Sequence, residues 1–373
     1  MSDQVILQAI DVVKHFGGGD GWLTRAPVVQ AVDGLSFDVM RGETFAIVGE
    51  SGCGKSTLAR LLMRLLSQTS GDVLFEGRQI SSVEGEELRK LRRDMQFIFQ
   101  DPFSSLNPRM TVGKLVGEPL EVHAPELSAR ERRSKVATLL RQVGLRQEHA
   151  DRYPHEFSGG QRQRVGIARA LASGPKLIIG DEPVSALDVS VQAQVINLLG
   201  DISRELGLTL VIIAHDLGVI RHMSDRVAVM YLGRIVEIGS TEDVFTDPKH
   251  PYTQALLAAI PSMDGKRTDH SATVKGEMPS PSDPPSGCRF HTRCPYAQDR
   301  CRSETPHLSP GARRSHQVAC HFSETLERPA SLVAPKPRSE TVEARFALYR
   351  AATEGGTVKH LKNPNQHQQT ERT

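Results

Sequence analysis

The chain has 373 residues, with 46 Lys and Arg against 44 Asp and Glu, so its formal net charge is +2. A balance this close to neutral excludes the strong overall field of proteins that bind nucleic acid or anionic membranes through massed positive charge. No apolar run reaches the length of a membrane-spanning helix, and residues 1–10 lack the basic segment and apolar core of a signal peptide. We therefore expect no signal peptide and no transmembrane segment, in a chain long enough for about two domains.

Apolar and polar residues alternate in two stretches near the start of the chain, at residues 5–13 and 28–39. This pattern predicts two antiparallel strands joined by a glycine-rich loop. From residue 44 the pattern changes to apolar runs separated by helix-like stretches. Continuous apolar runs are typical of strands buried on both faces of a parallel sheet. These runs lie at residues 44–48, 176–183 and 208–216, and helical spacing is found at residues 58–66, 126–143 and 191–207. The sequence predicts an α/β fold, with a mostly parallel core sheet flanked by helices and an N-terminal antiparallel β part.

A glycine-rich loop joins the apolar run 44–48 to the helix-like run 58–66. It reads GESGCGKST, and Gly49-x4-Gly54-Lys55-Ser56 is the phosphate-binding loop pattern. Glycines let several backbone N–H groups point at one anion, and the following helix adds its positive end. Lys55 would reach the β- and γ-phosphates of a nucleoside triphosphate, and Ser56 would ligate Mg²⁺. The expected phosphate contacts are Gly49, Glu50, Ser51, Gly52, Cys53, Gly54, Lys55, Ser56 and Thr57.

Two further segments carry groups suited to phosphate chemistry. Asp181 and Glu182 end the apolar run 176–183, where one carboxylate can hold Mg²⁺ and its neighbour can polarise an attacking water. The sequence SGGQ at residues 158–161 opens a helix, and such a helix start is a second anion-binding end. One nucleotide does not need both the phosphate-binding loop and the SGGQ helix start from the same chain.

Six motifs in chain order resemble the nucleotide-binding subunits of ABC transporters. They are GESGCGKS, Gln100 in QFIFQD, SGGQ, LIIGDEP, SALD ending at Asp188, and AHD with His215. The resemblance implies that two subunits face head to tail, so that the phosphate loop of one and the SGGQ of the other enclose one ATP. A homologous ATP-binding subunit, giving a heterodimer, is therefore an expected partner.

The resemblance also assigns roles to the matching positions. Glu182 would be the general base, and His215 would hydrogen-bond the γ-phosphate and hold the geometry of the attacking water. Gln100 would serve Mg²⁺ and report to the membrane subunits. The other assignments are Ser56 and Asp181 to Mg²⁺, Ser158, Gly159, Gly160, Gln161 and Asp188 to the partner or its ATP, and Phe16 to adenine, with a core position as the alternative for Phe16.

Two segments, residues 100–112 and 249–261, resemble the oligopeptide and dipeptide importer branch, and in particular its second ATP-binding subunit. This implies import of peptides or related solutes, with two integral membrane permease subunits and, indirectly, an extracytoplasmic solute-binding protein as partners and no nucleic acid. The chain would be peripheral on the cytoplasmic face of the inner or plasma membrane. Residues 103–112 would grip a permease helix, with an ordinary surface loop as the alternative.

Three other functions stay open on the sequence. A nickel or glutathione importer subunit shares the branch features. A soluble ABC ATPase acting on DNA or ribosomes is disfavoured, because the chain has no long coiled-coil insertion and no second fused cassette. A regulatory subunit without hydrolysis is disfavoured by the intact Glu182.

Composition divides the chain into three regions. Residues 1–262 are the expected nucleotide-binding domain, with a helical subdomain over about 101–172; residues 263–325 form a C-terminal oligopeptide-transporter-type region; and residues 326–373 are a polar tail that we expect to be disordered. The residues just after 262 have the polar, proline- and serine-rich composition of a linker.

Four cysteines gather in the second region, at Cys288, Cys294, Cys301 and Cys320. Four thiolates can hold zinc or a four-iron cluster, and these spacings are wider than those of common zinc ribbons. The resemblance implies a [4Fe-4S] cluster, with Zn²⁺ and metal-free, disulfide-prone thiols as alternatives. We expect the nearby His291, His316 and His321 at the surface rather than among the ligands. Cys53 is expected to be a small filler in the phosphate loop, and its alkylation should block ATP.

Overall fold

The computed structural model describes residues 4–17, 27–215, 217–260, 276–310 and 315–326. Most of the loop expected at 17–27, the first part of the linker and the tail from residue 327 lie outside the described residues, and the expectations for them are not tested. Within the described ranges, no helix is long and apolar enough to cross a membrane.

The N-terminal part is a four-stranded antiparallel sheet in the order β2-β1-β4-β5. Its strands are β1 (Val5–Phe16), β2 (Val29–Met40), β4 (Ser70–Phe75) and β5 (Arg78–Gln79). The two strands predicted from alternation pair antiparallel along their length, with irregularities in register. The predicted N-terminal β part is therefore confirmed.

The central sheet has eight strands in the order β11-β12-β10-β9-β3-β8-β7-β6. The parallel part comprises β3 (Thr44–Val48), β6 (Met95–Ile98), β7 (Leu177–Asp181), β8 (Thr209–Ala214) and β9 (Arg226–Tyr231). An antiparallel edge comprises β10 (Arg234–Ser240), β11 (Ser309–Pro310) and β12 (Gln317–Val318). Every residue of β3, β7 and β8 is buried, as the apolar runs predict.

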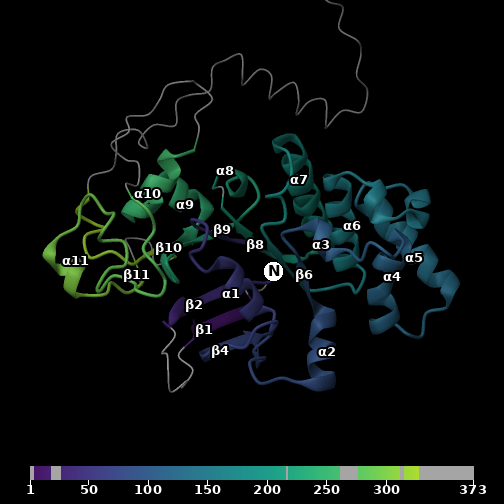
Figure 1. Cartoon of the computed structure of the whole chain (residues 1–373), viewed down its shortest axis with the longest axis horizontal. Helices are drawn as coiled ribbons and strands as arrows, with labels where there is room; N and C mark the ends of the chain where they lie inside the picture. The colour runs from purple at the N-terminus through teal and green to yellow at the C-terminus, as the bar shows by residue number, and fades with distance from the viewer. Residues whose placement is uncertain (1–3, 18–26, 216, 261–275, 311–314, 327–373) are drawn as a thin grey trace, which may run out of the picture. The chain divides into compact units, whose positions relative to one another are not determined.

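Alternate residues of the central strands enter two different cores. Phe45 and Ile47 join a core with β1, β2 and α1, whereas Ala46 and Val48 join a core with helices α4, α6 and α7. The helices are α1 (Lys55–Leu62), α2 (Gly85–Asp94), α3 (Pro102–Ser105), α4 (Val112–His123), α5 (Ala129–Gln142), α6 (Gly159–Leu171), α7 (Val189–Leu206), α8 (Leu217–Ile220), α9 (Thr241–Thr246), α10 (Pro251–Ala258) and α11 (Asp299–Ser303). Helices α3 to α6 gather on one side of the central strands (Figure 1). The predicted α/β class is confirmed.

Two details differ from the sequence prediction. The helix after the phosphate loop ends at Leu62 rather than near residue 66, because Arg64 adopts a positive φ of 52°. The C-terminal region also contributes to the central sheet, since β12 pairs antiparallel with β10. Strands of two residues carry no periodic signal, so the sequence did not indicate this pairing.

Candidate nucleotide site

The phosphate loop joins β3 to α1, and β3 lies between β9 and β8 inside the central sheet. Gly54 precedes α1 with a φ of 106°, and a Cβ there would lie 2.0 Å from the carbonyl oxygen of Ala31. A Cβ on Gly49 would lie 2.1 Å from the carbonyl oxygen of Met230. Neighbouring backbone therefore leaves room for glycine alone at both ends of the loop.

The amine of Lys55 is held inside this loop. Its Nζ donates to the carbonyl oxygens of Gly49 at 2.8 Å and Glu50 at 2.9 Å, and the residue is only 4% exposed. The backbone of the phosphate loop thus holds the positive charge of Lys55 inside the loop, where a phosphate would bind.

Ser56 and Asp181 meet at the base of the loop. Ser56 Oγ donates to Asp181 Oδ1 at 2.8 Å, and Asp181 is 3% exposed at the end of β7. Burial, reinforced by the charge of Glu182, raises the pKa of Asp181, while the hydrogen bond from Ser56 opposes the shift. A hydroxyl beside a buried carboxylate provides the hard oxygen ligands that suit Mg²⁺, so these residues fit that ion.

Three polar side chains meet at the carboxyl ends of β6, β7 and β8. They are Gln100, Glu182 and His215. Gln100 Nε2 donates to Glu182 Oε2 at 2.9 Å, and His215 Nδ1 lies 3.7 Å from the same oxygen. The backbone of Glu182 has a positive φ of 45°, and its N–H donates to the carbonyl oxygen of Ile213 at 3.0 Å. Gln100 therefore holds the carboxylate of Glu182, and the bond to Ile213 holds its backbone.

The SGGQ segment begins α6 as predicted. Ser158 Oγ accepts from the N–H of Gln161, and Gln161 Oε1 accepts from the N–H of Ser158, which is a capping box. A Cβ on Gly160 would lie 2.3 Å from Val191 Cγ1, so glycine lets α6 approach the start of α7. Helices α6 and α1 lie apart in Figure 1.

The remaining predicted residues are Asp188, Phe16 and Cys53. Asp188 is exposed at the start of α7, with no side-chain hydrogen bond to the helix.

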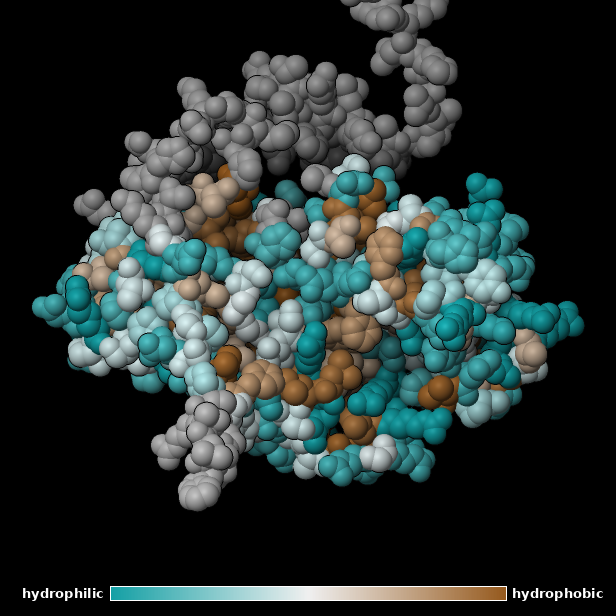
Figure 2. Space-filling model, viewed as in Figure 1, coloured by the Kyte–Doolittle hydropathy of each residue, from teal (hydrophilic) through white to brown (hydrophobic). Residues whose placement is uncertain are grey.

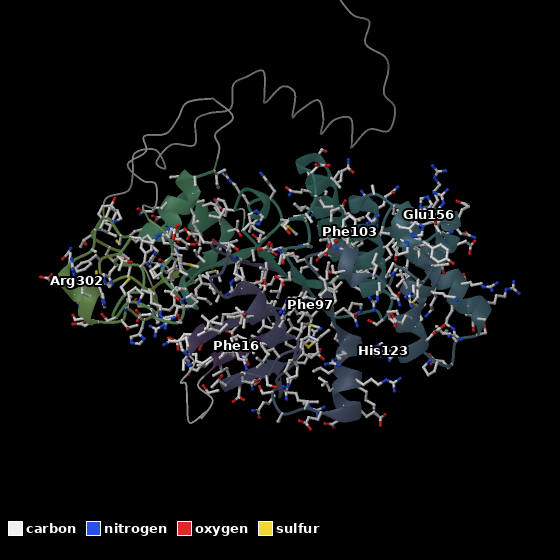
Figure 3. The ribbon with its side chains drawn as sticks, in the orientation of Figure 1. Phe16, Phe97, Phe103, His123, Glu156 and Arg302 are labelled. Atoms are coloured by element: carbon white, nitrogen blue, oxygen red, sulfur yellow. The ribbon has the colours of Figure 1, made fainter. Side chains whose placement is uncertain are left out.

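Phe16 lies at the end of β1 (Figure 3) and is 39% exposed, which excludes the alternative core position. Lys14 Nζ lies 5.0 Å from the centroid of the Phe16 ring. Cys53 is 1% exposed and lies against Gly49, in keeping with a filler role, and burial raises the pKa of its thiol. The effect of its alkylation remains a prediction.

Glu50 has contacts that the motif does not reveal. Its carboxylate pairs with Arg293 of the C-terminal region, and its N–H donates to the hydroxyl of Tyr252 in α10. Arg293 lies 243 positions from Glu50 in sequence, so no local pattern indicates the pair.

The four C-terminal cysteines line one small cavity of about 20 Å³ together with Phe290 and His291. Burial raises the pKa of Cys294 to about 12 and of Cys320 to about 11, and it also raises that of Cys288. Convergence of four thiols on one cavity fits the chemistry of a thiolate-bound metal. As the side chains stand, however, no group of three or more His, Cys, Asp or Glu in the described part of the chain has the geometry to hold an ion.

The expectation of surface histidines is wrong for His316. Its ring is 6% exposed, and Nε2 lies 2.7 Å from Oε1 of the fully buried Glu237 on β10. This pairing explains the burial, since it satisfies a carboxylate inside the sheet region. His291 and His321 are partly exposed.

A large groove of about 290 Å³ lies between β6, α4 and α6. Its walls include three exposed apolar side chains, Leu65 at 45%, Phe99 at 48% and Val122 at 39%. Ser105 and Leu106, from the segment expected to grip a permease, line it too. Hydrophobic residues gather across the middle of the face in Figure 2, and Phe97 and His123 of the groove are labelled in Figure 3.

Comparison with known proteins gives two family matches. Residues 32–185 match the model of the ABC transporter family, and residues 236–301 match the oligopeptide/dipeptide transporter C-terminal region. A probable peptide ABC transporter ATP-binding protein, y4tS of Sinorhizobium fredii, is 53% identical over 96% of this chain and 99% of its own length. The oligopeptide transport ATP-binding protein AppF of Bacillus subtilis is 52% identical over 86% of this chain and 98% of its own length.

Solved structures agree at the level of the fold. The ATP-binding cassette MJ0796, in a dimeric post-hydrolysis state bound to ADP and Pi, is 31% identical with a TM-score of 0.57, and the match covers 63% of this chain and 99% of that one. Another is cbiO1 from Clostridium perfringens, part of the ABC transporter complex cbiONQ, at 30% identity and a TM-score of 0.57, covering 65% of this chain and 92% of that one.

Proposed function

Because the chain belongs to the ATP-binding proteins of oligopeptide and dipeptide ABC transporters, and is therefore an ABC-type ATPase, we propose that it powers import of peptides or related small solutes. The import function rests on the relatives, and one observation carries ATP hydrolysis as its energy source. Three groups lie where parallel strands end: Lys55, the Ser56–Asp181 pair and the Gln100–Glu182–His215 cluster. The carboxyl edge of such strands is where ligands bind in α/β sheets.

The phosphate loop holds ATP through its backbone N–H groups and Lys55. Ser56 and Asp181, already in contact with each other, hold Mg²⁺ together with Gln100. The bound ion supplies charge neutralisation at the phosphates. Phe16, exposed at the end of β1, stacks on adenine.

Glu182 acts as the general base for hydrolysis. Its position supports the role, because Gln100 Nε2 fixes the carboxylate and the N–H of Glu182 fixes its backbone to the carbonyl of Ile213. His215, 3.7 Å from the same carboxylate and 55% exposed, orients the attacking water and contacts the γ-phosphate.

Two ATP-binding subunits pair head to tail, so that Ser158, Gly160 and Asp188 of one chain complete the site of the other. The exposed positions of Ser158 and Asp188, and the distance between α6 and α1 within one chain, support this arrangement. The second subunit is a related but different chain, and both lie on the cytoplasmic face of the membrane.

The groove between β6, α4 and α6 receives a cytoplasmic helix from one of two permease subunits. Leu65, Phe99 and Val122 offer apolar anchors. Arg92 and the ion pair between Arg169 and Glu118 add charged groups along the same groove. A groove of this kind suits an amphipathic helix. Gln100 directly follows Phe99, so movement in the groove reaches the carboxylate of Glu182.

The proposed nucleotide-binding domain is residues 1–262, and the proposed C-terminal region is residues 263–325. In that region Cys288, Cys294, Cys301 and Cys320 would hold a [4Fe-4S] cluster, with Zn²⁺ as the alternative. Their shared cavity supports this. Anaerobic purification with an absorbance spectrum and assays of iron, sulfide and zinc tests it. About four iron and four sulfide per chain would support the cluster. Stoichiometric zinc would overturn the cluster and support the alternative, and the absence of any metal would overturn both.

Affinity purification from detergent-solubilised membranes of the source cells tests the transport function. We expect a tagged chain to bring down two integral membrane proteins and a second ATP-binding chain. Recovery of ribosomes or DNA without any membrane protein would overturn the importer function and leave the ATPase activity standing.

A further inference from the structure

Arg293, in the C-terminal region, contacts the phosphate loop through two hydrogen bonds. Its Nη1 donates to Glu50 Oε2 at 2.8 Å, and its Nη2 donates to Glu50 Oε1 at 3.1 Å. The Arg293 side chain is 7% exposed, so the pair is shielded from water on the arginine side. A bidentate pair of this kind fixes direction as well as distance, which a lone surface ion pair does not.

Glu50 in turn organises the loop through all of its polar groups. Its carbonyl oxygen accepts from Lys55 Nζ at 2.9 Å and from the N–H of Cys53 at 3.3 Å. Its N–H donates to the hydroxyl of Tyr252 at 2.8 Å. A rotation of Glu50 would therefore move one of the two carbonyl oxygens, those of Gly49 and Glu50, that accept from the Lys55 amine.

Arg293 also contacts Tyr231, which packs against two further aromatic rings. Arg293 Nη1 also donates to the hydroxyl of Tyr231 at 3.4 Å. The Tyr231 ring lies 4.7 Å from that of Tyr252 and 5.2 Å from that of Phe290, measured between centroids. Phe290 belongs to the same C-terminal segment as Arg293 and is buried. The position of the Arg293 guanidinium is thus fixed by this aromatic packing as well as by its ion pair with Glu50.

We propose that Arg293 is a positioning residue for ATP binding: it holds Glu50 so that the carbonyl of Glu50 keeps Lys55 in place to bind phosphate. The inference rests on the proposed role of the phosphate loop. It makes the C-terminal region part of the nucleotide site, although that region contributes no motif residue. Its segment also runs between the cysteine cavity and the loop, since Cys294 follows Arg293 directly.

ATP binding and turnover by the full chain test the proposal. We expect Arg293→Gln to raise the Kd for ATP, measured by calorimetry without Mg²⁺ to prevent turnover, by roughly ten-fold, the scale of one hydrogen bond to a charged group. The KM for ATP should rise in parallel, while kcat at saturating ATP stays within about two-fold, because the catalytic carboxylate is not in contact with Arg293. Arg293→Lys, which keeps the charge, should recover part of the affinity.

Two further variants separate positioning from general stability. Glu50→Gln should weaken ATP to the same extent, and the double variant should be no weaker than either single one, since both remove the same pair. Arg300→Gln, which breaks the exposed pair between Arg300 and Glu304 in the same region, should leave ATP affinity unchanged.

The outcomes are distinct for the two proposals. A folded Arg293→Gln protein with the affinity of the unmodified chain would overturn the positioning role while leaving the function intact. If that variant does not fold, unchanged affinity in Glu50→Gln overturns the role instead. An unmodified chain that binds no ATP would overturn the proposed function itself, and the positioning role with it.

Discussion

Glu182 is constrained in both its side chain and its backbone. Its side chain is 14% exposed, its Oε2 accepts from Gln100, and its backbone adopts a conformation that non-glycine residues seldom adopt. Strain of this kind persists when neighbouring structure enforces it. The neighbouring structure therefore holds the Glu182 carboxylate in one position, as a general base requires.

We expect Glu182→Gln to lower kcat for ATP hydrolysis by at least about 100-fold, because the amide cannot take a proton from water. ATP affinity should be kept, since the phosphate loop is untouched. Mixed with its partner ATP-binding subunit, the variant should also accumulate as a closed, ATP-bound dimer, detected by size exclusion with ATP. Glu205→Gln, at an exposed position near the end of α7, serves as the matched control. Rapid turnover by Glu182→Gln would remove Glu182 as the base.

Asp33 links β2 to β10 and to the C-terminal region. It accepts from Arg234 Nη2 at 2.8 Å, and Arg289 and His15 contact the same carboxylate. Burial by itself would raise the pKa of Asp33, but the hydrogen bond from Arg234 and the charge of Arg289 outweigh it and hold the pKa below 3.8. A lowered pKa stabilises the fold above 3.8, and this stabilisation is lost as pH falls through the lowered value.

Asp33→Asn should therefore be less stable than the unmodified chain at pH 7, and the difference should shrink as the pH falls below about 4. Urea unfolding midpoints measured at a series of pH values give the comparison. A difference that stays constant down to about pH 3 would show that ionisation of Asp33 contributes nothing to stability.

Residues of the nucleotide site were predictable from sequence where their chemistry demands a fixed local spacing. Gly54, Lys55 and Ser56 are such residues, because the turn and the helix start allow few alternatives. Arg293 was not predictable, since its partner Glu50 lies 243 positions away and only the packed fold brings the two together. The burial of His316 was missed for the same reason: its partner Glu237 lies 79 positions away.

At the scale of elements, β10 and β12 fasten the C-terminal region to the main sheet. Only two residue pairs are in register between them, so backbone bonds alone give a weak attachment. The fully buried Glu237 strengthens it by accepting from His316 and from the N–H groups of Lys249 and His250. The sequence predicted the long strands from their apolar runs, but it could not predict a two-residue strand held by one buried pair.

His316→Ala should loosen this attachment. Removing the ring leaves a buried carboxylate with one fewer donor and a small void, which should lower the free energy of unfolding by roughly 2 kcal/mol. Thermal unfolding gives the loss of stability, and limited proteolysis should locate the loosened segment near β12. His307→Ala, at an exposed position in the same region, should change neither measurement. Equal stability of the two variants would contradict a fastening role for His316.

At the scale of the whole molecule, the groove and the nucleotide site are neighbours along the chain. Phe99 lines the groove, and the next residue, Gln100, donates to Glu182. A partner helix seated in the groove would therefore lie one residue from a side chain that contacts the proposed base. Such closeness allows coupling between ATP and a membrane partner without any long relay.

Val122→Glu should separate the two functions. A carboxylate at this half-exposed position would place a charge among the apolar anchors, and its desolvation would weaken a docked helix. The variant should lose the permease subunits in affinity purification, while its affinity for ATP stays within about two-fold, because Val122 belongs to α4 and not to the phosphate loop. Leu206→Glu, 55% exposed at the end of α7 and outside the groove, should retain the permeases. Retention by both variants would show that the permeases dock on another surface, and loss by both would show that the effect reflects added charge and not the groove.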